Sequence, residues 1–124
     1  PLLTQRAMIT FMERGHWDQH LRRSRIFYKK KHAAILQAIK QNFGSKAEVV
    51  GQGAGLHIVV ELAKCISNEA KFLDKAKQHG VSLLPFSAFY ASGEPKKNRL
   101  LIGFGGPPVD KICQGIKVLS KLID

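Results

Sequence analysis

The stretch VVGQGAGLHIVVELA, residues 49–63, decides what kind of fold the sequence describes. Its three glycines, Gly51, Gly53 and Gly55, stand before the run LHIVVEL, which has the β-branched composition of a strand. A glycine loop that holds a phosphate opens a helix, so that backbone N–H groups point at the anion. Because a strand follows these glycines, we predict a turn between strands at 47–50 and 55–62 and reject a phosphate loop.

Two helices are predicted before this hairpin. Thr4 is a candidate cap for a short helix that ends at Gly15. Over residues 16–43 apolar side chains recur at helical spacing, which predicts one long helix that ends at Gly44. The apolar stripe of this helix consists of Trp17, Leu21, Tyr28, Ile35, Ile39 and Phe43.

A third and a fourth helix are predicted after the hairpin. Ser67 is a candidate cap for a helix that ends at Gly80, and strands are expected at 81–85 and 99–104. The segment from residue 107 to the end has apolar residues at alternating spacings of three and four, as in an amphipathic helix. The side chains expected to face inward are Ala70, Leu73, Ala76, Val109, Ile112, Ile116, Leu119 and Ile123.

This order of elements predicts an α+β fold. Helices followed by strands, without regular βα alternation, are typical of a two-layer domain in which helices pack on a small, mainly antiparallel sheet. A length of 124 residues suits a single domain over 1–124, with the long helix at about 16–43 and the sheet and other helices in 47–124. Such a fold hosts many functions, so the residues of a site must decide the function.

Composition argues against a secreted or membrane protein but does not identify the partner of this basic chain. Cys65 and Cys113 have no metal-like or redox-like spacing, and no signal peptide or membrane-length apolar run is present, so we expect a cytoplasmic protein without a membrane partner. The net charge of +11 is compatible with nucleic acid, an anionic membrane surface or an acidic partner. The charge alone does not choose among these partners.

The basic run RRSRIFYKKKH, residues 22–32, is the strongest charge feature. On a helix, Arg22, Arg25 and Lys29 share one face, which suits contacts with phosphates. The same face lies opposite the apolar stripe, where a solvated helix carries its charges in any case. We favour the solvated face, because no helix-turn-helix, zinc finger or aromatic RNA-binding motif accompanies the run.

Catalytic patterns are missing from the sequence. None of His16, His20, His32, His57 and His79 has a second ligand at metal spacing, so each is expected to be a surface or packed residue. Ser87 lacks the flanking residues of a nucleophile elbow. The residues themselves therefore predict a binding or accessory domain.

Four segments in order resemble the carboxy-terminal end of fold-type I pyridoxal-phosphate proteins. They are GHWDQHLRRSRIFYKKKHAAILQAI, GAGLHIVVEL, GVSLLPFSAFY and NRLLIGFGG, the last followed by the final helix. The pattern is similar in particular to the MocR/GabR branch of GntR-type transcription regulators. The resemblance covers nearly the whole chain.

The resemblance implies a longer parent protein. Such regulators join a winged helix-turn-helix domain to an aminotransferase-like large domain that holds pyridoxal phosphate on a lysine, and they end in a small domain. Pyridoxal phosphate is therefore expected in the parent and not on this fragment, which has no lysine in a cofactor context. The implied partners are an amino-acid-like effector, DNA through the missing amino-terminal domain, and a second copy in a homodimer.

The resemblance also suggests an effector site. Aminotransferases of this kind carry an arginine for the substrate carboxylate three residues before the aromatic residue of the last strand. Here that position is Leu101, and Arg99 lies two residues earlier on the same face of the strand. We therefore predict Arg99 as an effector-binding residue, with Tyr90 and Ser87 from the loop at the pocket edge. In the simpler interpretation Arg99 is a surface arginine and Tyr90 only packs.

Two other functions stay open. The chain is alternatively the small domain of a genuine class I/II pyridoxal-phosphate aminotransferase, or an independent basic binding module without a cofactor.

Overall fold

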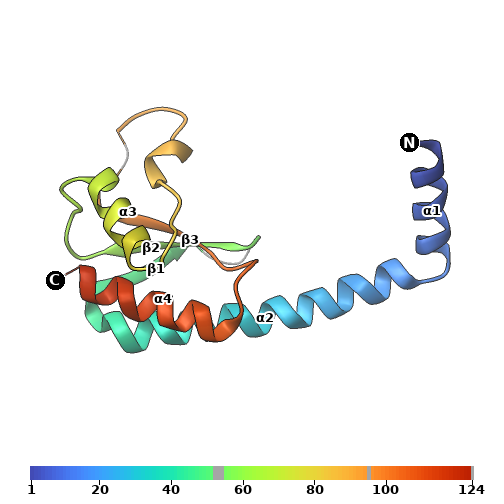
Figure 1. Ribbon diagram of the computed structural model, residues 1–124, viewed down its shortest axis with the longest axis horizontal. Helices are drawn as coiled ribbons and strands as arrows, with labels where there is room; N and C mark the ends of the chain where they lie inside the picture. Colours follow the sequence, from blue (N-terminus) through green and yellow to red (C-terminus); the bar gives the residue numbers. More distant parts are fainter. Residues whose placement is uncertain (52–54, 95, 124) are drawn as a thin grey trace. The chain divides into compact units, whose positions relative to one another are not determined.

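The computed structural model describes residues 1–51, 55–94 and 96–123. Contacts divide the chain into two compact units, residues 1–30 and residues 31–124, which are described separately. The prediction of a single domain over 1–124 stays a prediction. The elements, in order, are α1 (Leu2–Glu13), α2 (His16–Phe43), the 3-10 turn η1 (Gly44–Lys46), β1 (Ala47–Gly51), β2 (His57–Leu62), α3 (Glu69–Gln78), the 3-10 turn η2 (Phe86–Phe89), β3 (Arg99–Gly103) and α4 (Val109–Leu122) (Figure 1).

The second unit is built on an antiparallel sheet in the order β1-β2-β3. Strand β2 is central and pairs with both neighbours. Leu62 of β2 lies opposite Ala47 of β1, and Glu61 of β2 lies opposite Arg99 of β3. The register of β1 against β2 shifts between Val49 and Gly51, as at a β-bulge. This pairing confirms the predicted hairpin and α+β fold, although residues 52–54 of its turn lie outside the described residues.

One face of the sheet is the floor of the hydrophobic core. Helix α4 and the part of α2 after Lys30 run along this side (Figure 1). Burial of these apolar surfaces supplies most of the driving force for folding of the unit. The buried side chains of the core include, from the sheet, Ile58, Val60, Leu62, Leu100 and Ile102, and, from the helices, Ile35, Ala38, Ile39, Phe43, Ala76, Ile112, Ile116 and Leu119.

The predicted helix stops are confirmed, but two predicted caps are wrong. Gly15, Gly44 and Gly80 have φ of 77°, 54° and 82°, a conformation that suits glycine at a helix end. Thr4 is not a cap, because the first turn of α1 already closes from the amide of Gln5 to the carbonyl of Pro1 at 2.9 Å. Helix α3 is capped by Asn68 rather than Ser67.

The Asn68 cap shows why a prediction one residue away was wrong. The Oδ1 atom of Asn68 accepts a hydrogen bond from the Lys71 amide at 3.0 Å, the geometry of an N-cap. The inward face of α3 also differs from the prediction, because Phe72 packs against the core while Ala70 is exposed. Val109, in the first turn of α4, is also exposed, contrary to prediction.

The strand predicted at 81–85 is reduced to one bridge. Leu84 pairs with Leu101 in an isolated antiparallel bridge, and no longer ladder forms in this described segment. Pro85 follows directly and has no amide hydrogen to extend the ladder. The chain turns into η2 instead, which brings the loop at residues 86–90 to the edge of β3.

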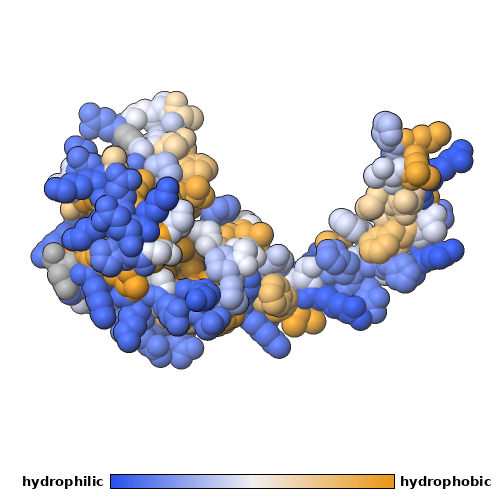
Figure 2. Space-filling view, in the orientation of Figure 1, coloured by the Kyte–Doolittle hydropathy of each residue, from blue (hydrophilic) through white to orange (hydrophobic). Residues whose placement is uncertain are grey.

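The first unit contains α1 and the start of α2 and has no buried side chain. Figure 2 shows apolar side chains gathered along α1. Arg22, Arg23, Arg25, Lys29 and Lys30 are exposed, as predicted for a solvated helix face. The large apolar side chains exposed in this unit are Leu2, Leu3, Met8, Ile9, Phe11, Met12, Ile26 and Phe27.

Candidate effector site on the outer face of the sheet

The candidate site lies on the face of the sheet opposite the core, here named the outer face. Because side chains alternate along a strand, the outer face carries the cross-strand pairs Glu61↔Arg99, Val59↔Leu101 and His57↔Gly103. Arg99 and Leu101 therefore share a face, as predicted. This places a charged pair at one end of the outer face and a histidine at the other.

Arg99 is held by its cross-strand partner. Its Nε donates a hydrogen bond to Oε2 of Glu61 at 2.8 Å, and the side chain remains 25% exposed. The guanidinium carbon lies 5.9 Å from the centre of the Phe86 ring, within the range of a cation–π contact. The guanidinium is thus held by the hydrogen bond from Nε to Glu61 and by its contact with the Phe86 ring.

Tyr90 joins the same group of residues. Its ring meets Phe86 edge-on at a centroid distance of 5.3 Å, and its hydroxyl oxygen accepts a hydrogen bond from the Lys96 amide at 3.3 Å. The Lys96 ammonium lies 3.9 Å from Oε2 of Glu61. Glu61, Arg99, Phe86, Tyr90 and Lys96 therefore form a closed ring of contacts, here named the Arg99 cluster.

Glu61 is the anionic centre of the Arg99 cluster. The hydrogen bond from Arg99 is the main cause that holds the pKa of the Glu61 carboxyl below its ordinary value of 4.5. Desolvation acts in the opposite direction, and the charges of Lys96 and Arg99 lower the pKa further. Glu61 is consequently a carboxylate at neutral pH and a firm acceptor for Arg99.

The remaining edge of Arg99 is available for a ligand. Among the described residues, neither terminal nitrogen of the guanidinium has a hydrogen-bond partner. A planar guanidinium with two free N–H groups along one edge matches the two oxygens of a carboxylate. The Arg99 cluster can therefore bind a carboxylate, with Glu61 orienting the arginine from behind.

Ser87 belongs to a different set of contacts. Its hydroxyl and its amide both donate to the carboxylate of Glu69 on α3, the amide at 3.3 Å to Oε2. Ser87 and Glu69 line a hollow of about 380 Å³, together with Lys96. The structure thus brings Arg99 and Tyr90 together and uses Ser87 to fasten the 86–90 loop to α3.

Sequence reasoning missed Lys31, which was counted in the solvated basic run. The side chain is only 3% exposed, and its Nζ donates to the carbonyl oxygens of Pro107 at 2.7 Å and Gly105 at 3.3 Å. The signal was present in the spacing: the apolar stripe jumps seven residues from Tyr28 to Ile35, two helical turns. A residue near position 31 has to fill the gap on that face.

Two glycines of the GFGG motif, Gly103 and Gly105, are explained by close packing. A Cβ atom at Gly103 would lie 3.3 Å from Cδ2 of His57, and one at Gly105 would lie 2.7 Å from Cδ1 of Leu56. The Phe104 amide also donates to the Leu56 carbonyl at 2.9 Å. Residues 56–57 and 103–105 therefore form one packed junction at the His57 end of the sheet.

Comparison with known proteins agrees with this architecture, although no protein-family model matches the chain. The HTH-type transcriptional regulator YhdI of Bacillus subtilis is 39% identical over 117 residues, which cover 94% of this chain and 24% of the regulator. The probable rhizopine catabolism regulatory protein MocR of Rhizobium meliloti is 24% identical over 118 residues, covering 95% of this chain and 24% of its own length.

A solved structure points to the same family. The kynurenine aminotransferase of Pyrococcus horikoshii, in complex with PMP and kynurenine, superposes with a TM-score of 0.79 at 31% identity, covering 91% of this chain and 28% of the enzyme. The chain is therefore similar both to HTH-type transcriptional regulators and to aminotransferases, and its fold matches part of an aminotransferase. It spans about a quarter of the length of the curated relatives it matches.

The described part of this aminotransferase-like chain does not fit pyridoxal phosphate. A Schiff base needs a lysine whose amine is free to become neutral and nucleophilic. Lys31 is the one buried lysine among the described residues, and its ammonium is already committed to the carbonyls of Gly105 and Pro107. The aminotransferase relatives imply dependence on pyridoxal phosphate in the family, and no chemical step is assigned to this chain.

The described part of the chain offers neither a metal site nor a membrane-spanning helix. Across residues 1–51, 55–94 and 96–123, no group of three His, Cys, Asp or Glu side chains is placed to hold a metal ion. None of the described helices has the length and apolar character needed to cross a membrane.

Proposed function

We propose that this chain is the carboxy-terminal small domain of an aminotransferase-like, DNA-binding transcriptional regulator, and that it forms one wall of the effector site. The match to YhdI along 94% of the chain supports the regulator. The proposal of an effector site rests on the Arg99 guanidinium. Glu61 accepts a hydrogen bond from its Nε, while its two terminal nitrogens have no partner among the described residues.

In this proposal the DNA-binding domain and the cofactor-binding domain belong to other parts of the regulator. A helix-turn-helix domain binds DNA, and a large domain holds pyridoxal phosphate on its own lysine. The parent acts as a homodimer in the cytoplasm. The small domain supplies the carboxylate contact, so that an amino-acid-like effector bridges the two parts of the aminotransferase-like region.

Each member of the site has a separate task. Arg99 grips the effector carboxylate through its two terminal nitrogens, and Glu61 keeps the guanidinium from rotating away. Tyr90 forms a wall of the pocket, because its ring and hydroxyl are both fixed by neighbours in the Arg99 cluster. Ser87 holds the 86–90 loop in place through Glu69.

The test is an effector titration of the full-length protein with DNA binding as the readout. Arg99→Lys keeps the charge but loses the two-pronged contact, so we expect effector affinity to fall by about 1 to 3 kcal/mol, the scale of a charge-assisted hydrogen bond. DNA binding without effector should stay intact. Arg23→Lys is the matched control, since Arg23 is exposed and outside the cluster. Unchanged titrations in both Arg99→Lys and Arg99→Ala would remove Arg99 from the site.

A genuine class I/II aminotransferase is the second candidate. The 31% identity and TM-score of 0.79 to the kynurenine aminotransferase favour it. The reading frame upstream of Pro1 separates the candidates: a helix-turn-helix domain supports the regulator, and an aminotransferase-type start supports the enzyme. Transamination by the full-length protein would then be measured directly.

Measurements on the 124-residue chain by itself test whether the cofactor is held outside this chain. We expect no transaminase activity and no specific pyridoxal-phosphate adduct, because Lys31 is occupied and every other described lysine is exposed. The measurement is borohydride trapping followed by mass spectrometry. One specifically labelled lysine with a stable absorbance band would contradict the assignment of the cofactor to the missing large domain.

A further inference from the structure

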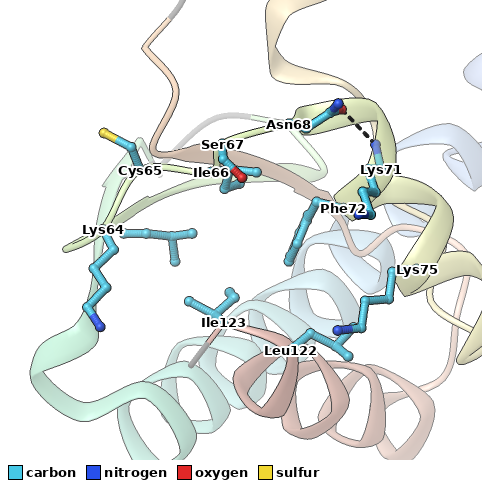
Figure 3. Close-up of a pocket in the computed structure, with 11 residues that line it drawn as sticks. Lys64, Cys65, Ile66, Ser67, Asn68, Lys71, Phe72, Lys75, Leu122 and Ile123 are labelled. Atoms are coloured by element: carbon cyan, nitrogen blue, oxygen red, sulfur yellow. Dashed lines mark hydrogen bonds between the residues drawn. The ribbon is translucent and has the colours of Figure 1, made fainter.

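A groove that shares no residue with the Arg99 cluster opens at the end of the second unit. It is formed by the end of β2 with the following segment, by the first turns of α3 and by the end of α4, and its volume is about 350 Å³ (Figure 3). This volume is at the lower end of the range for small-molecule pockets, about 300 to 1,000 Å³. The groove is therefore large enough for a small ligand.

The floor of the groove is apolar. Leu62 is only 2% exposed and belongs to the buried core, while Ile66, Phe72, Leu122 and Ile123 are half-buried and pack against it. An edge of the hydrophobic core is thus left partly open to solvent here. An apolar body that covered this edge would be stabilised by about 25 cal/mol for each Å² removed from water.

The sides of the groove are cationic. Lys71 and Lys75 stand one helical turn apart on α3, and Lys64 comes from the opposite side, with Phe72 and Ile123 between them (Figure 3). None of these three ammonium groups has an ion-pair or hydrogen-bond partner among the described residues. Among the described residues that line the groove there is no aspartate or glutamate.

A second source of positive potential lies at the same place. The groove includes Ser67, Asn68 and Lys71, so it borders the amino-terminal end of α3. The partial positive charge of a helix amino terminus favours anions in its first turn. The lysine side chains and the helix end therefore select for the same sign of charge.

We propose that this groove binds a small amphipathic carboxylate, with its apolar body on the Phe72 and Leu122 floor and its carboxylate on the lysine ammonium groups. Charge complementarity decides the class of ligand, since three lysines surround an apolar floor and no carboxylate among the described lining residues is available to bind a cationic group. The site goes beyond the proposed function, because it is separate from the effector contact at Arg99.

The probe is decanoate, titrated into the isotopically labelled 124-residue chain and followed by NMR. We expect chemical shift changes at the amides of residues 64–75 and at the side chains of Leu122 and Ile123. Decyltrimethylammonium, which has the same tail and the opposite charge, should bind there at least about tenfold more weakly. A site-resolved readout is needed because the exposed apolar residues of α1 also attract alkyl chains.

Two variants with equal net charge complete the test. The groove variant K64E/K71E/K75E should weaken decanoate binding at residues 64–75 by about tenfold or more, which corresponds to 1.4 kcal/mol. The control K40E/K77E/K117E changes three exposed lysines outside the groove and should bind decanoate within about twofold of the unchanged chain. Equal weakening in both variants, equal binding of the cation, or shifts confined to α1 would each overturn the proposal.

Discussion

Residues 1–30 and residues 31–124 are both largely ordered in helices or sheet, but different forces hold them. Every buried side chain of the described chain lies at or after Lys31, and the sheet, α4 and the second part of α2 share one core. In residues 1–30 the backbone hydrogen bonds of the helices are present without buried side chains. Because an isolated helix of about 12 residues is marginal in water, stability in this chain resides in the second region.

The largest expected effect compares the same substitution in the two regions. Ile35 is fully buried in α2, whereas Ile9 in α1 is 52% exposed. Ile35→Ala should lower the free energy of unfolding by about 2 to 5 kcal/mol, because it removes core contacts and leaves a cavity. Ile9→Ala should change it by less than about 0.5 kcal/mol. Urea unfolding followed by circular dichroism measures both values, and similar losses would break the comparison.

A smaller effect is expected where the two regions meet in sequence. Lys31→Met removes the donor to the carbonyls of Gly105 and Pro107, while Lys30→Met changes an exposed neighbour. We expect Lys31→Met to cost about 1 to 3 kcal/mol in unfolding free energy, the scale for unpaired buried acceptors. Lys30→Met should be close to neutral. If both variants unfolded at the same urea concentration, the Lys31 contacts would contribute nothing to stability.

Helix α2 and its Lys31 show which structural features could be predicted from the sequence and which could not. The bounds of α2 and the stops at Gly44 and Gly80 were predictable, because helical periodicity and glycine conformation are local properties. The burial of Lys31 depends on carbonyl groups 74 and 76 residues later in the chain. The gap in the apolar stripe indicates that position 31 faces the core, but only the tertiary contacts show which groups accept hydrogen bonds from its ammonium group.

In the candidate site, too, some residues could be placed from sequence patterns and others only from tertiary contacts. Strand alternation placed Arg99 and Leu101 on one face, and the hairpin register then set Glu61 opposite Arg99. The contact between Phe86 and Arg99 required the loop after Pro85 to turn toward β3, which no local pattern indicates. Ser87 could not be assigned from sequence, since its partner Glu69 lies on a helix 18 residues earlier.

The pH dependence of the second region tests the Glu61–Arg99 pair. The pKa of Glu61 is lowered on folding, so the stabilisation is fully present above its ordinary value of 4.5 and is lost as pH falls through the depressed value. The unfolding midpoint of the unchanged chain should therefore approach that of Glu61→Gln on acidification, and exceed it at neutral pH. Glu13→Gln, in the first region, should follow the unchanged chain throughout. A constant difference between Glu61→Gln and the unchanged chain would show that the pair does not stabilise the fold.

The smallest effect is expected for the arginines of the first region. Arg22, Arg23 and Arg25 are exposed, and we propose that they pair with the rest of the parent protein. The triple variant R22E/R23E/R25E should change the unfolding free energy of this chain by about 0.5 kcal/mol or less per site. It should also weaken DNA binding, but only the salt-sensitive, sequence-independent kind that a net charge of +11 produces. The control K40E/K77E/K117E removes the same charge elsewhere, so both variants should lose affinity equally in a titration at two salt concentrations. Tight binding of one DNA sequence at physiological salt, lost only in the arginine variant, would instead make the first region a specific DNA reader.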